Sequence, residues 1–274
     1  MHSSVLLQLR RAGIPTAYVL TESPYDPGRE TDIAPCAQVV FTNERSCVDA
    51  FRAVQPHTYY LGAAYDPERH HPSEPDESVP AHDVVFVGVG FSERIALLGG
   101  VDWSGIDLGL YGGWSLLGSR SRLRQYVRGN IIPNEMAAKL YGRAKIGLNL
   151  YRTSIGIGHH VEHIQHAESL NPRAVELAAC RVFQVSDYRA EVSDVFGSAA
   201  PTARTSAELE AIIRRALADE PYRAAMAERA YECVTPASFT SRARQMVATL
   251  ERVADASGFR TISRDGVGAD MVRR

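Results

Sequence analysis

Short apolar runs alternate with segments of helical spacing along most of the chain. In its first part, apolar runs at 16–20, 38–42 and 58–61 predict strands, and the segments at 3–12 and 45–54 predict helices. Because strands that alternate with helices usually form parallel sheets, this part of the chain predicts an α/β unit.

The same alternation resumes near residue 83 with a longer set of elements. The run DVVFVGV at 83–89 is apolar at nearly every position, which is typical of a strand buried on both faces. Further strands are predicted at 106–111, 145–150 and 181–186, and helices at 93–99, 120–128, 133–143 and 171–180. Three more helices close the chain, the first with a capping box of Thr205 and Glu208. The repeated β-α order predicts a doubly wound unit.

A proline-rich stretch separates the two units. Residues 66–80, DPERHHPSEPDESVP, contain four prolines and few apolar side chains, so they cannot form a packed core. We divide the chain into a partial N-terminal unit at 1–72, a linker at 73–82, a second unit at 83–257 and a flexible tail at 258–274. Two such units predict a cleft at the carboxyl ends of their strands, where ligands bind to open parallel sheets.

Composition narrows the classes of function. The chain has 274 residues and a net charge of −2, which gives no general attraction for nucleic acid or an anionic membrane. No apolar run approaches the roughly 18 residues of a membrane span. The four cysteines form no C-x-x-C pair, which predicts reduced thiols in a cytoplasmic protein. Any phosphate binding must therefore come from a local site.

The stretch ESLNPRAVELAACRVFQVSD suggests such a site. Glu168 and Glu176 flank the start of the helix predicted at 171–180. A helix N-terminus favours phosphate, while carboxylates accept hydrogen bonds from sugar hydroxyls, so the pair suits a sugar nucleotide. Asn171 and Arg173 share this turn, and Arg173 can pair with phosphate or hold a carboxylate. The alternative is a solvated loop acid followed by a helix-dipole partner.

Two further groups of residues have candidate roles. Gly88 and Gly90 in VGVGFSER let phosphate approach backbone N–H groups, with Arg94 as the countercharge, although a tight turn without ligand gives the same pattern. Glu22 follows a strand at its carboxyl end and is the best candidate for a general base, although a turn cap is equally compatible.

A histidine-rich segment, GIGHHVEHIQHAES, precedes the carboxylate pair. His163 and His166 would share one face of a helix, so a metal site, and with it a metal-dependent hydrolase, is an alternative. The segment lacks an H-E-x-x-H pattern and a cysteine cluster. A loop that contacts the ligand, or a plain exposed loop, explains it more simply.

Taken in order, several runs resemble the CgeB-like (spore-maturation type) glycosyltransferases, a branch of the two-domain GT-B enzymes. The resemblance covers about 16–250 and is carried by TAYVLTESPYDP, QVVFTNE, LGAAYDPERHHP, DVVFVGVGFSER, LYGGW, LYGRAKIGLNLY and NPRAVELAACRVFQVSD. It implies an α/β, GT-B-like fold class with two Rossmann-type parallel-sheet units, the first of them truncated. It also implies a nucleotide-sugar donor on the second unit and an unknown acceptor, whether glycan, protein or small molecule, on the first.

The resemblance also implies roles for individual residues. Related enzymes bind the donor with an E-x7-E pair, which places Glu168 at the sugar and Glu176 at the ribose. The diphosphate would lie on the loop of Gly88 and Gly90, with Asn149 facing the same cleft. Catalysis would rest on Glu22 as base and on Arg94 and Arg173 at the departing diphosphate. No metal and no cofactor are expected beyond the sugar nucleotide.

The chain departs from the family pattern at two places. Arg181 stands where the family has a glycine after the carboxylate helix. The first unit lacks the strands and helices with which a complete domain would begin, so we expect an incomplete acceptor half. An exposed edge strand can pair with another chain, which leaves a homo-oligomer open. The alternative function is a non-catalytic nucleotide- or sugar-binding relic of a GT-B enzyme.

Overall fold

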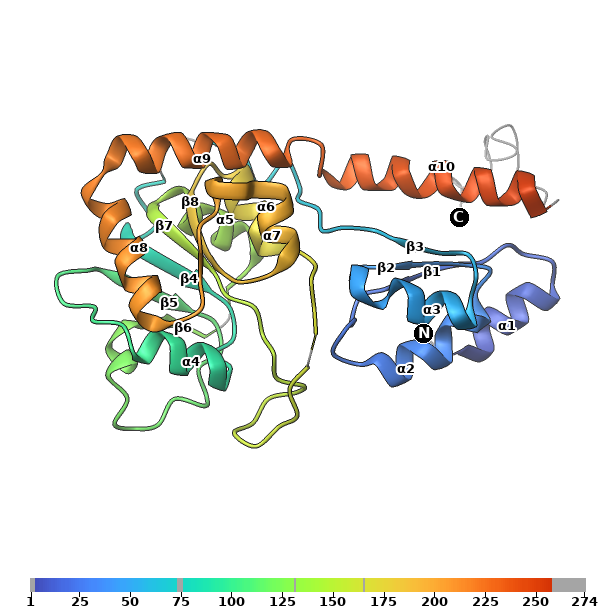
Figure 1. Ribbon diagram of the computed structural model, residues 1–274, viewed down its shortest axis with the longest axis horizontal. Helices are drawn as coiled ribbons and strands as arrows, with labels where there is room; N and C mark the ends of the chain where they lie inside the picture. Colours follow the sequence, from blue (N-terminus) through green and yellow to red (C-terminus); the bar gives the residue numbers. More distant parts are fainter. Residues whose placement is uncertain (1–2, 73–75, 131, 165, 258–274) are drawn as a thin grey trace, which may run out of the picture.

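The computed structural model describes residues 3–72, 76–130, 132–164 and 166–257, and the tail predicted at 258–274 lies outside these ranges. It contains two parallel sheets, each with its own helices (Figure 1). Among the described helices, none combines the length and apolar character that crossing a membrane requires.

The first sheet has three parallel strands in the order β1-β2-β3. Its elements are α1 (Ser3–Arg11), β1 (Ala17–Leu20), α2 (Pro27–Ile33), β2 (Val39–Thr42), α3 (Val48–Val54) and β3 (Thr58–Tyr60). Side chains alternate across β2, so Val40 packs with Leu20 and Phe51 on the face covered by α1, α2 and α3. The sequence predicted these strands and helices except α2, whose N-cap is Asp26.

The other face of this sheet is covered by α10 (Phe239–Ser257), the last described helix of the chain (Figure 1). Val39 and Phe41 point to this face and pack with Val253. The sequence-based division assigned residues up to 257 to the second unit, and the structure differs at this helix. The physical reason is that the central strand β2 has apolar side chains on both faces, and a helix must pack on each face to bury them from water.

The second sheet has six parallel strands in the order β6-β5-β4-β7-β8-β9, which is the doubly wound order. Its strands are β4 (His82–Val87), β5 (Leu108–Tyr111), β6 (Val127–Gly129), β7 (Ala144–Asn149), β8 (Phe183–Asp187) and β9 (Thr202–Ala203). Its helices are α4 (Ser92–Gly99), α5 (Asn134–Gly142), α6 (Pro172–Ala179), α7 (Ala190–Phe196), α8 (Ser206–Ala218) and α9 (Glu220–Val234).

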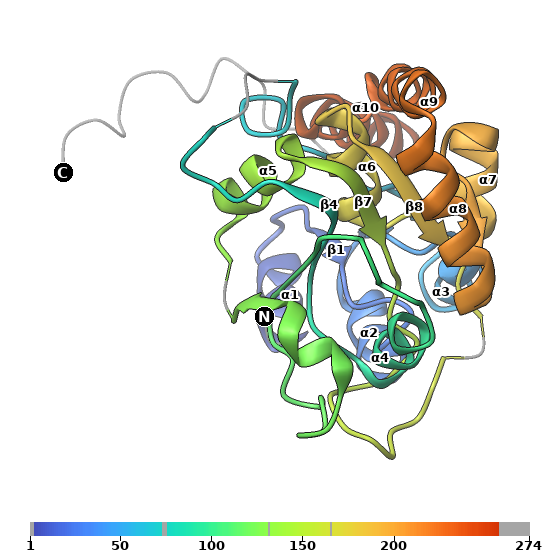
Figure 2. The ribbon, with the colours of Figure 1, turned by 90° about the vertical axis from the view of Figure 1, so that its left-hand side faces the viewer.

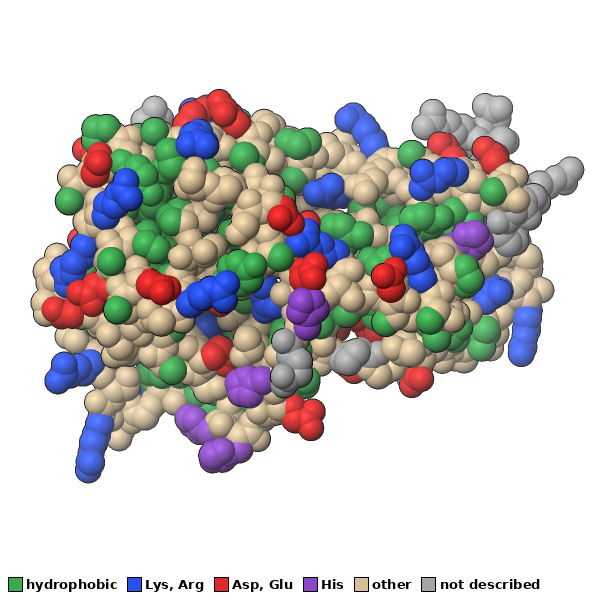
Figure 3. Space-filling model, viewed as in Figure 1, with side chains coloured by type: hydrophobic (Ala, Val, Ile, Leu, Met, Phe, Trp, Pro, Cys, Tyr) green, Lys and Arg blue, Asp and Glu red, His purple; other side chains and the backbone are tan. Residues whose placement is uncertain are grey.

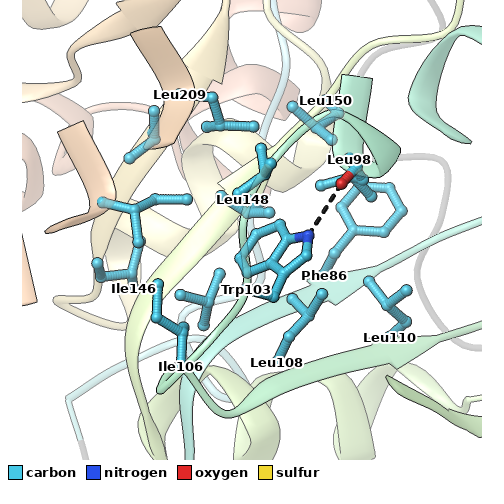
Figure 4. Packing of buried hydrophobic residues seen from close by; sticks show 14 of the residues in the cluster. Phe86, Leu98, Trp103, Ile106, Leu108, Leu110, Ile146, Leu148, Leu150 and Leu209 are labelled. Carbon is cyan, nitrogen blue, oxygen red and sulfur yellow. Dashed lines mark hydrogen bonds between the residues drawn. The ribbon is translucent and has the colours of Figure 1, made fainter. Parts of the chain in front are cut away.

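Helices cover both faces of this sheet, and Figure 2 shows its strands between α4 and α6. On the α4 and α8 side, Trp103 lies in the core and its indole Nε1 donates to the Leu98 carbonyl at 2.9 Å (Figure 4). On the opposite side, Leu140 of α5 and Leu177 of α6 pack against Val85 of β4. Burial on both faces explains the continuous apolar run from which the first strand of this unit was predicted.

The prediction of a helix at 120–128 was wrong. The chain forms a short 3-10 helix at Arg122–Tyr126 and then the strand β6. Val127 pairs with Leu110 of β5. The residues that would have extended the helix therefore form a strand at the edge of the sheet. The sequence analysis also did not identify α7, β6 and β9.

Two connections join the units and lie side by side (Figure 1). Tyr65, on the first connection, forms a parallel bridge with Ser238, which precedes α10. The Tyr65 amide donates to the Ala237 carbonyl at 3.2 Å, and the Phe239 amide donates to the Tyr65 carbonyl at 3.0 Å. Of the predicted linker at 73–82, residues 73–75 lie outside the described residues and His82 begins β4.

Candidate functional site

A cavity of about 350 Å³ lies where the two units meet at the carboxyl ends of β4 and β7. The first unit contributes Tyr25, and the second contributes the start of α6 with Arg173 and Glu176. The remaining lining comes from Val87, Arg94, Ile132, Asn134, Ala137, Tyr141, Tyr151, Arg152, Asn171 and Pro172. This is the position at which open parallel sheets bind their ligands. A larger cavity of about 520 Å³, between residues 66–71 and α5, is lined by charges of both signs and lies away from these strand ends.

The N-terminus of α6 faces this cavity. Asn171 is its N-cap, and the Asn171 Oδ1 accepts a hydrogen bond from the Ala174 amide at 3.0 Å. Pro172 occupies the first helical position, where its missing N–H costs nothing. The sequence predicted this helix start, and the structure assigns the Asn171 carboxamide oxygen to capping it.

Arg94 lies beneath the cavity and is only 6% exposed. Its Nη1 donates to the Val89 carbonyl at 2.8 Å, and its Nη2 and Nε donate to the carbonyls of Leu150 at 2.6 Å and Tyr151 at 3.3 Å. Burial, with a further contribution from Arg173, lowers the pKa of Arg94 to about 9. In this arrangement Arg94 joins the loop after β4 to the segment after β7.

Arg173 stands on the first turn of α6 and is only partly buried. Its Nε donates to the Val87 carbonyl at 2.8 Å and its Nη1 to the Leu150 carbonyl at 3.2 Å. Two guanidinium groups therefore share the Leu150 carbonyl beside a helix N-terminus. The positive charge makes the cavity floor favourable for an anion.

The two glycines of the VGVG run have close neighbours of different kinds. A Cβ at Gly90 would lie 2.3 Å from the Trp114 ring, so this glycine is required for packing. A Cβ at Gly88 would lie 2.7 Å from the Arg173 Nη2. The absence of a side chain at Gly88 thus lets Arg173 approach the end of β4, and the phosphate contact stays a prediction.

Glu176 and Asn149 lie at different depths. Glu176 lines the cavity from α6, and burial raises the pKa of its carboxyl, while Arg173 and Arg69 oppose that rise. Asn149 is fully buried at the end of β7, where its Nδ2 donates to the Ser186 Oγ at 3.1 Å. Its Oδ1 has no hydrogen-bond partner among the residues that the structure describes. Asn149 therefore lies below the cavity, outside its lining.

Glu168 lies outside the cavity lining, at the interface between the units. Its Oε2 pairs with the Arg45 Nε at 2.7 Å, and its Oε1 is 2.8 Å from the His166 Nε2. The hydrogen bonds from His166 and Arg45 hold the pKa of the Glu168 carboxyl below its usual range. The structure therefore separates the two predicted donor carboxylates, with Glu176 in the cavity and Glu168 beside it.

Glu22 is exposed and lies outside the cavity lining, but it contacts Arg152, which lines the cavity. The Arg152 Nη2 lies 3.4 Å from the Glu22 Oε2. The Arg152 guanidinium also stacks over the Tyr25 ring at 3.8 Å, and the Tyr25 hydroxyl donates to the Arg152 carbonyl at 2.8 Å. Sequence reasoning missed Tyr25 and Arg152 as cavity residues. The ESPYDP run contained Tyr25, but no local signal indicated its partner 127 residues away.

Two acidic side chains hold the segment that follows β7. The Glu93 carboxylate accepts hydrogen bonds from the amides of Thr153 at 2.6 Å and Ser154 at 3.0 Å. Despite partial burial, these bonds and that from the Ser154 hydroxyl lower the pKa of Glu93 to about 2. Asp187 accepts from the Tyr151 amide at 3.0 Å, but burial raises its pKa to about 6.

The raised pKa of Asp187 predicts a pH dependence of stability. Between its ordinary value of 3.8 and about 6, the unfolded state loses a proton that the folded state keeps, so stability falls as pH rises. In the wild type, Asp187 lowers the free energy of unfolding by at most about 3 kcal/mol as pH rises through this range, since one pKa unit is worth about 1.4 kcal/mol. We expect Asp187→Asn to abolish this part of the pH dependence. Urea unfolding of both proteins at pH 4 and pH 7 measures the difference. Parallel pH profiles would contradict this interpretation.

The histidine-rich segment forms a loop between β7 and α6, and histidine side chains line the face of it seen in Figure 3. Ser154 and His163 form an antiparallel bridge, so the segment is a loop, as the sequence favoured, and the alternative of a helix with His163 and His166 on one face is not what forms. Within the described ranges, no group of three or more His, Cys, Asp or Glu side chains has an arrangement that could hold a metal ion.

The sequence profile of the family described as glycosyl transferase-like matches residues 90–251, and the chain belongs to this family. A comparison with curated protein sequences found no match.

Solved structures with similar folds include sucrose-phosphate synthase from Thermosynechococcus elongatus, which is 16% identical with a TM-score of 0.64 over 93% of this chain and 72% of that chain. HepE from Anabaena, solved in complex with UDP-glucose, is 16% identical with a TM-score of 0.66 over 92% of this chain and 77% of that chain. Trehalose 6-phosphate synthase from Burkholderia multivorans is 13% identical with a TM-score of 0.60 over 93% and 70%. The α/β architecture with two parallel sheets is therefore that of the GT-B glycosyltransferases.

Proposed function

We propose that this glycosyltransferase-family chain transfers a sugar, of hexosyl or related type, from a nucleoside-diphosphate sugar to an acceptor that is a glycan, a protein or a small molecule. The observation that carries the proposal is the cavity between the units. It combines a helix N-terminus, the Arg173 guanidinium and the Glu176 carboxylate. The same cavity supports the finer assignment to the CgeB-like branch, whose matching runs contribute Tyr25, Glu176 and Arg173.

The ribose and the diphosphate of the donor each have a chemically matched partner in this cavity. The ribose hydroxyls donate to Glu176, which lies within α6, and the diphosphate lies against the N–H groups of the first turn and Arg173. Arg94 donates to the backbone carbonyls that shape the cavity floor and adds positive charge beneath it. The cavity thus suits a ligand with hydroxyl groups at one end and a diphosphate at the other.

In the transfer step, an acceptor hydroxyl oxygen forms a bond to the anomeric carbon while the bond from that carbon to the diphosphate oxygen breaks. The negative charge that develops on the diphosphate is stabilised by Arg173 and the helix N-terminus, which need no reorganisation. Glu22, held by Arg152 on the first unit's side, is the proposed base for the acceptor proton. We propose that these groups suffice without a metal or a further cofactor.

Two further expectations accompany this function. The four cysteines are free thiols in the structure, which supports a cytoplasmic location. The edge strand β1 supports a homo-oligomer formed by strand pairing.

The test is a calorimetric titration of the purified chain with UDP, GDP, ADP and TDP in the absence of added metal. UDP is tried first, since the HepE structure of similar fold contains UDP-glucose. We expect saturable binding of one nucleotide near the micromolar range, on the order of −8 kcal/mol. Failure of all four to bind to folded protein would refute the proposed donor site. Binding without turnover of any donor, with hydrolysis included as turnover, would instead identify a non-catalytic binding protein.

A further inference from the structure

Arg45 follows the central strand of the first unit and pairs with two carboxylates of the second unit. Its Nε lies 2.7 Å from the Glu168 Oε2, and its Nη1 lies 2.6 Å from the Asp194 Oδ2. The Arg45 and Glu168 side chains are 28% and 30% exposed, so their pair is shielded from water to a large extent. An isolated, exposed ion pair would contribute little to stability, but here each of the two partners is also held by a second contact.

The backbone around Glu168 is also held from the first unit. Glu44, which is 3% exposed, accepts hydrogen bonds from the amides of Glu168 at 3.0 Å and Ser169 at 3.2 Å. In return, the Ser169 Oγ accepts a hydrogen bond from the Arg45 amide at 2.8 Å. Two consecutive residues of the first unit therefore hold two consecutive residues of the second.

The other oxygen of the Glu168 carboxylate is 2.8 Å from the His166 Nε2. Both oxygens are thus engaged, one by the first unit and one by the second unit's own loop. A carboxylate has about four acceptor positions, so each oxygen can still accept one hydroxyl. The contacts fix the plane of the carboxylate without exhausting its capacity to bind a ligand.

We propose that Arg45 is a positioning residue for the donor sugar, which it orients through the Glu168 carboxylate. This inference rests on the proposed function and on the role that the family resemblance implies for Glu168, which is contact with the sugar. The nucleotide part of the donor is bound by Glu176 and Arg173, neither of which contacts Arg45. Loss of Arg45 therefore weakens recognition of the sugar and leaves recognition of the nucleotide intact. The acceptor-side unit in this way sets the orientation of the donor sugar.

The test compares two affinities in each protein. Calorimetry gives the Kd of the nucleoside diphosphate that the wild type binds and the Kd of its glucose conjugate. The preference for the conjugate is the ratio of the diphosphate Kd to the conjugate Kd. In Arg45→Met we expect this ratio to fall at least five-fold, with the diphosphate Kd unchanged within two-fold. Arg45→Lys, which keeps the charge but loses the fork that reaches both carboxylates, is expected to lie between Arg45→Met and the wild type. It also serves as the readout if Arg45→Met is unstable.

Asp194→Asn is the matched control, because it removes the other ion pair of Arg45 and leaves the pair with Glu168. We expect its preference for the conjugate to match that of the wild type. An unchanged preference in both Arg45 variants, or an equal fall for diphosphate and conjugate, would overturn the inference. Failure of the proposed function itself looks different, since the wild type would then bind no nucleoside diphosphate.

Discussion

Glu176→Ala is expected to weaken binding of the nucleoside-diphosphate donor about 100-fold and to reduce kcat/KM for transfer by at least the same factor. The ribose hydroxyls would lose two hydrogen bonds to a charged acceptor, each worth about 1.5 kcal/mol, and 1.4 kcal/mol corresponds to a factor of ten. Calorimetry with the nucleotide that the wild type binds measures the first effect. Donor-turnover kinetics measure the second.

Stability separates this effect from misfolding. Burial raises the pKa of Glu176, so its ionised form is disfavoured in the folded state. The protonated side chain therefore contributes to the free energy of unfolding at low pH, and this contribution is lost as pH rises through the raised pKa. At neutral pH, Glu176→Gln is therefore expected to be at least as stable as the wild type while it loses donor affinity. Glu135→Ala, which removes an exposed acid from the neighbouring helix α5, is the control and should bind normally. Normal donor binding by Glu176→Ala would contradict the proposed site.

Arg94→Met is expected to lower the free energy of unfolding by about 3 kcal/mol. The carbonyls of Val89, Leu150 and Tyr151 would lose a charged donor, and the bonds to the last two are buried. Leu150 keeps its bond from Arg173, and each of the other two carbonyls left unsatisfied costs about 1–3 kcal/mol, partly offset by removal of the repulsion between Arg94 and Arg173. Urea unfolding monitored by circular dichroism measures the change. Because Arg94 shapes the cavity floor, donor affinity should fall in parallel.

Arg124→Met provides a control for burial. Arg124 also donates to two backbone carbonyls, those of Gly118 at 3.0 Å and Leu117 at 2.9 Å, but its side chain is exposed. Water can replace it there, so we expect a loss below about 1 kcal/mol. Equal losses in the two variants would show that burial of Arg94 is not the cause.

The departure at Arg181 shows how far a local pattern can be interpreted. The family glycine suggests a turn that needs a left-handed backbone, and Arg181 does have a φ of +54°. The sequence identified the position, but it did not show what supports an arginine there. In the structure, Arg181 pairs with Glu228 at 2.9 Å and stacks on the Tyr231 ring at 4.5 Å. Both contacts come from α9, a helix that sequence reasoning had no means of placing beside this turn.

The sequence by itself determined most elements of the fold, but not α2, α7, β6 and β9, and it determined the start of α6. Apolar runs mark β4, β7 and β8 because these strands are buried on both faces, and Asn171 with Pro172 marks a helix start because capping is a local interaction. The tertiary structure decided what the charged residues do. Glu168 pairs with Arg45 across 123 residues, and Arg94 reaches carbonyls 56 and 57 residues away. Such contacts depend on how the two units and their connecting segments are joined, which no local spacing encodes.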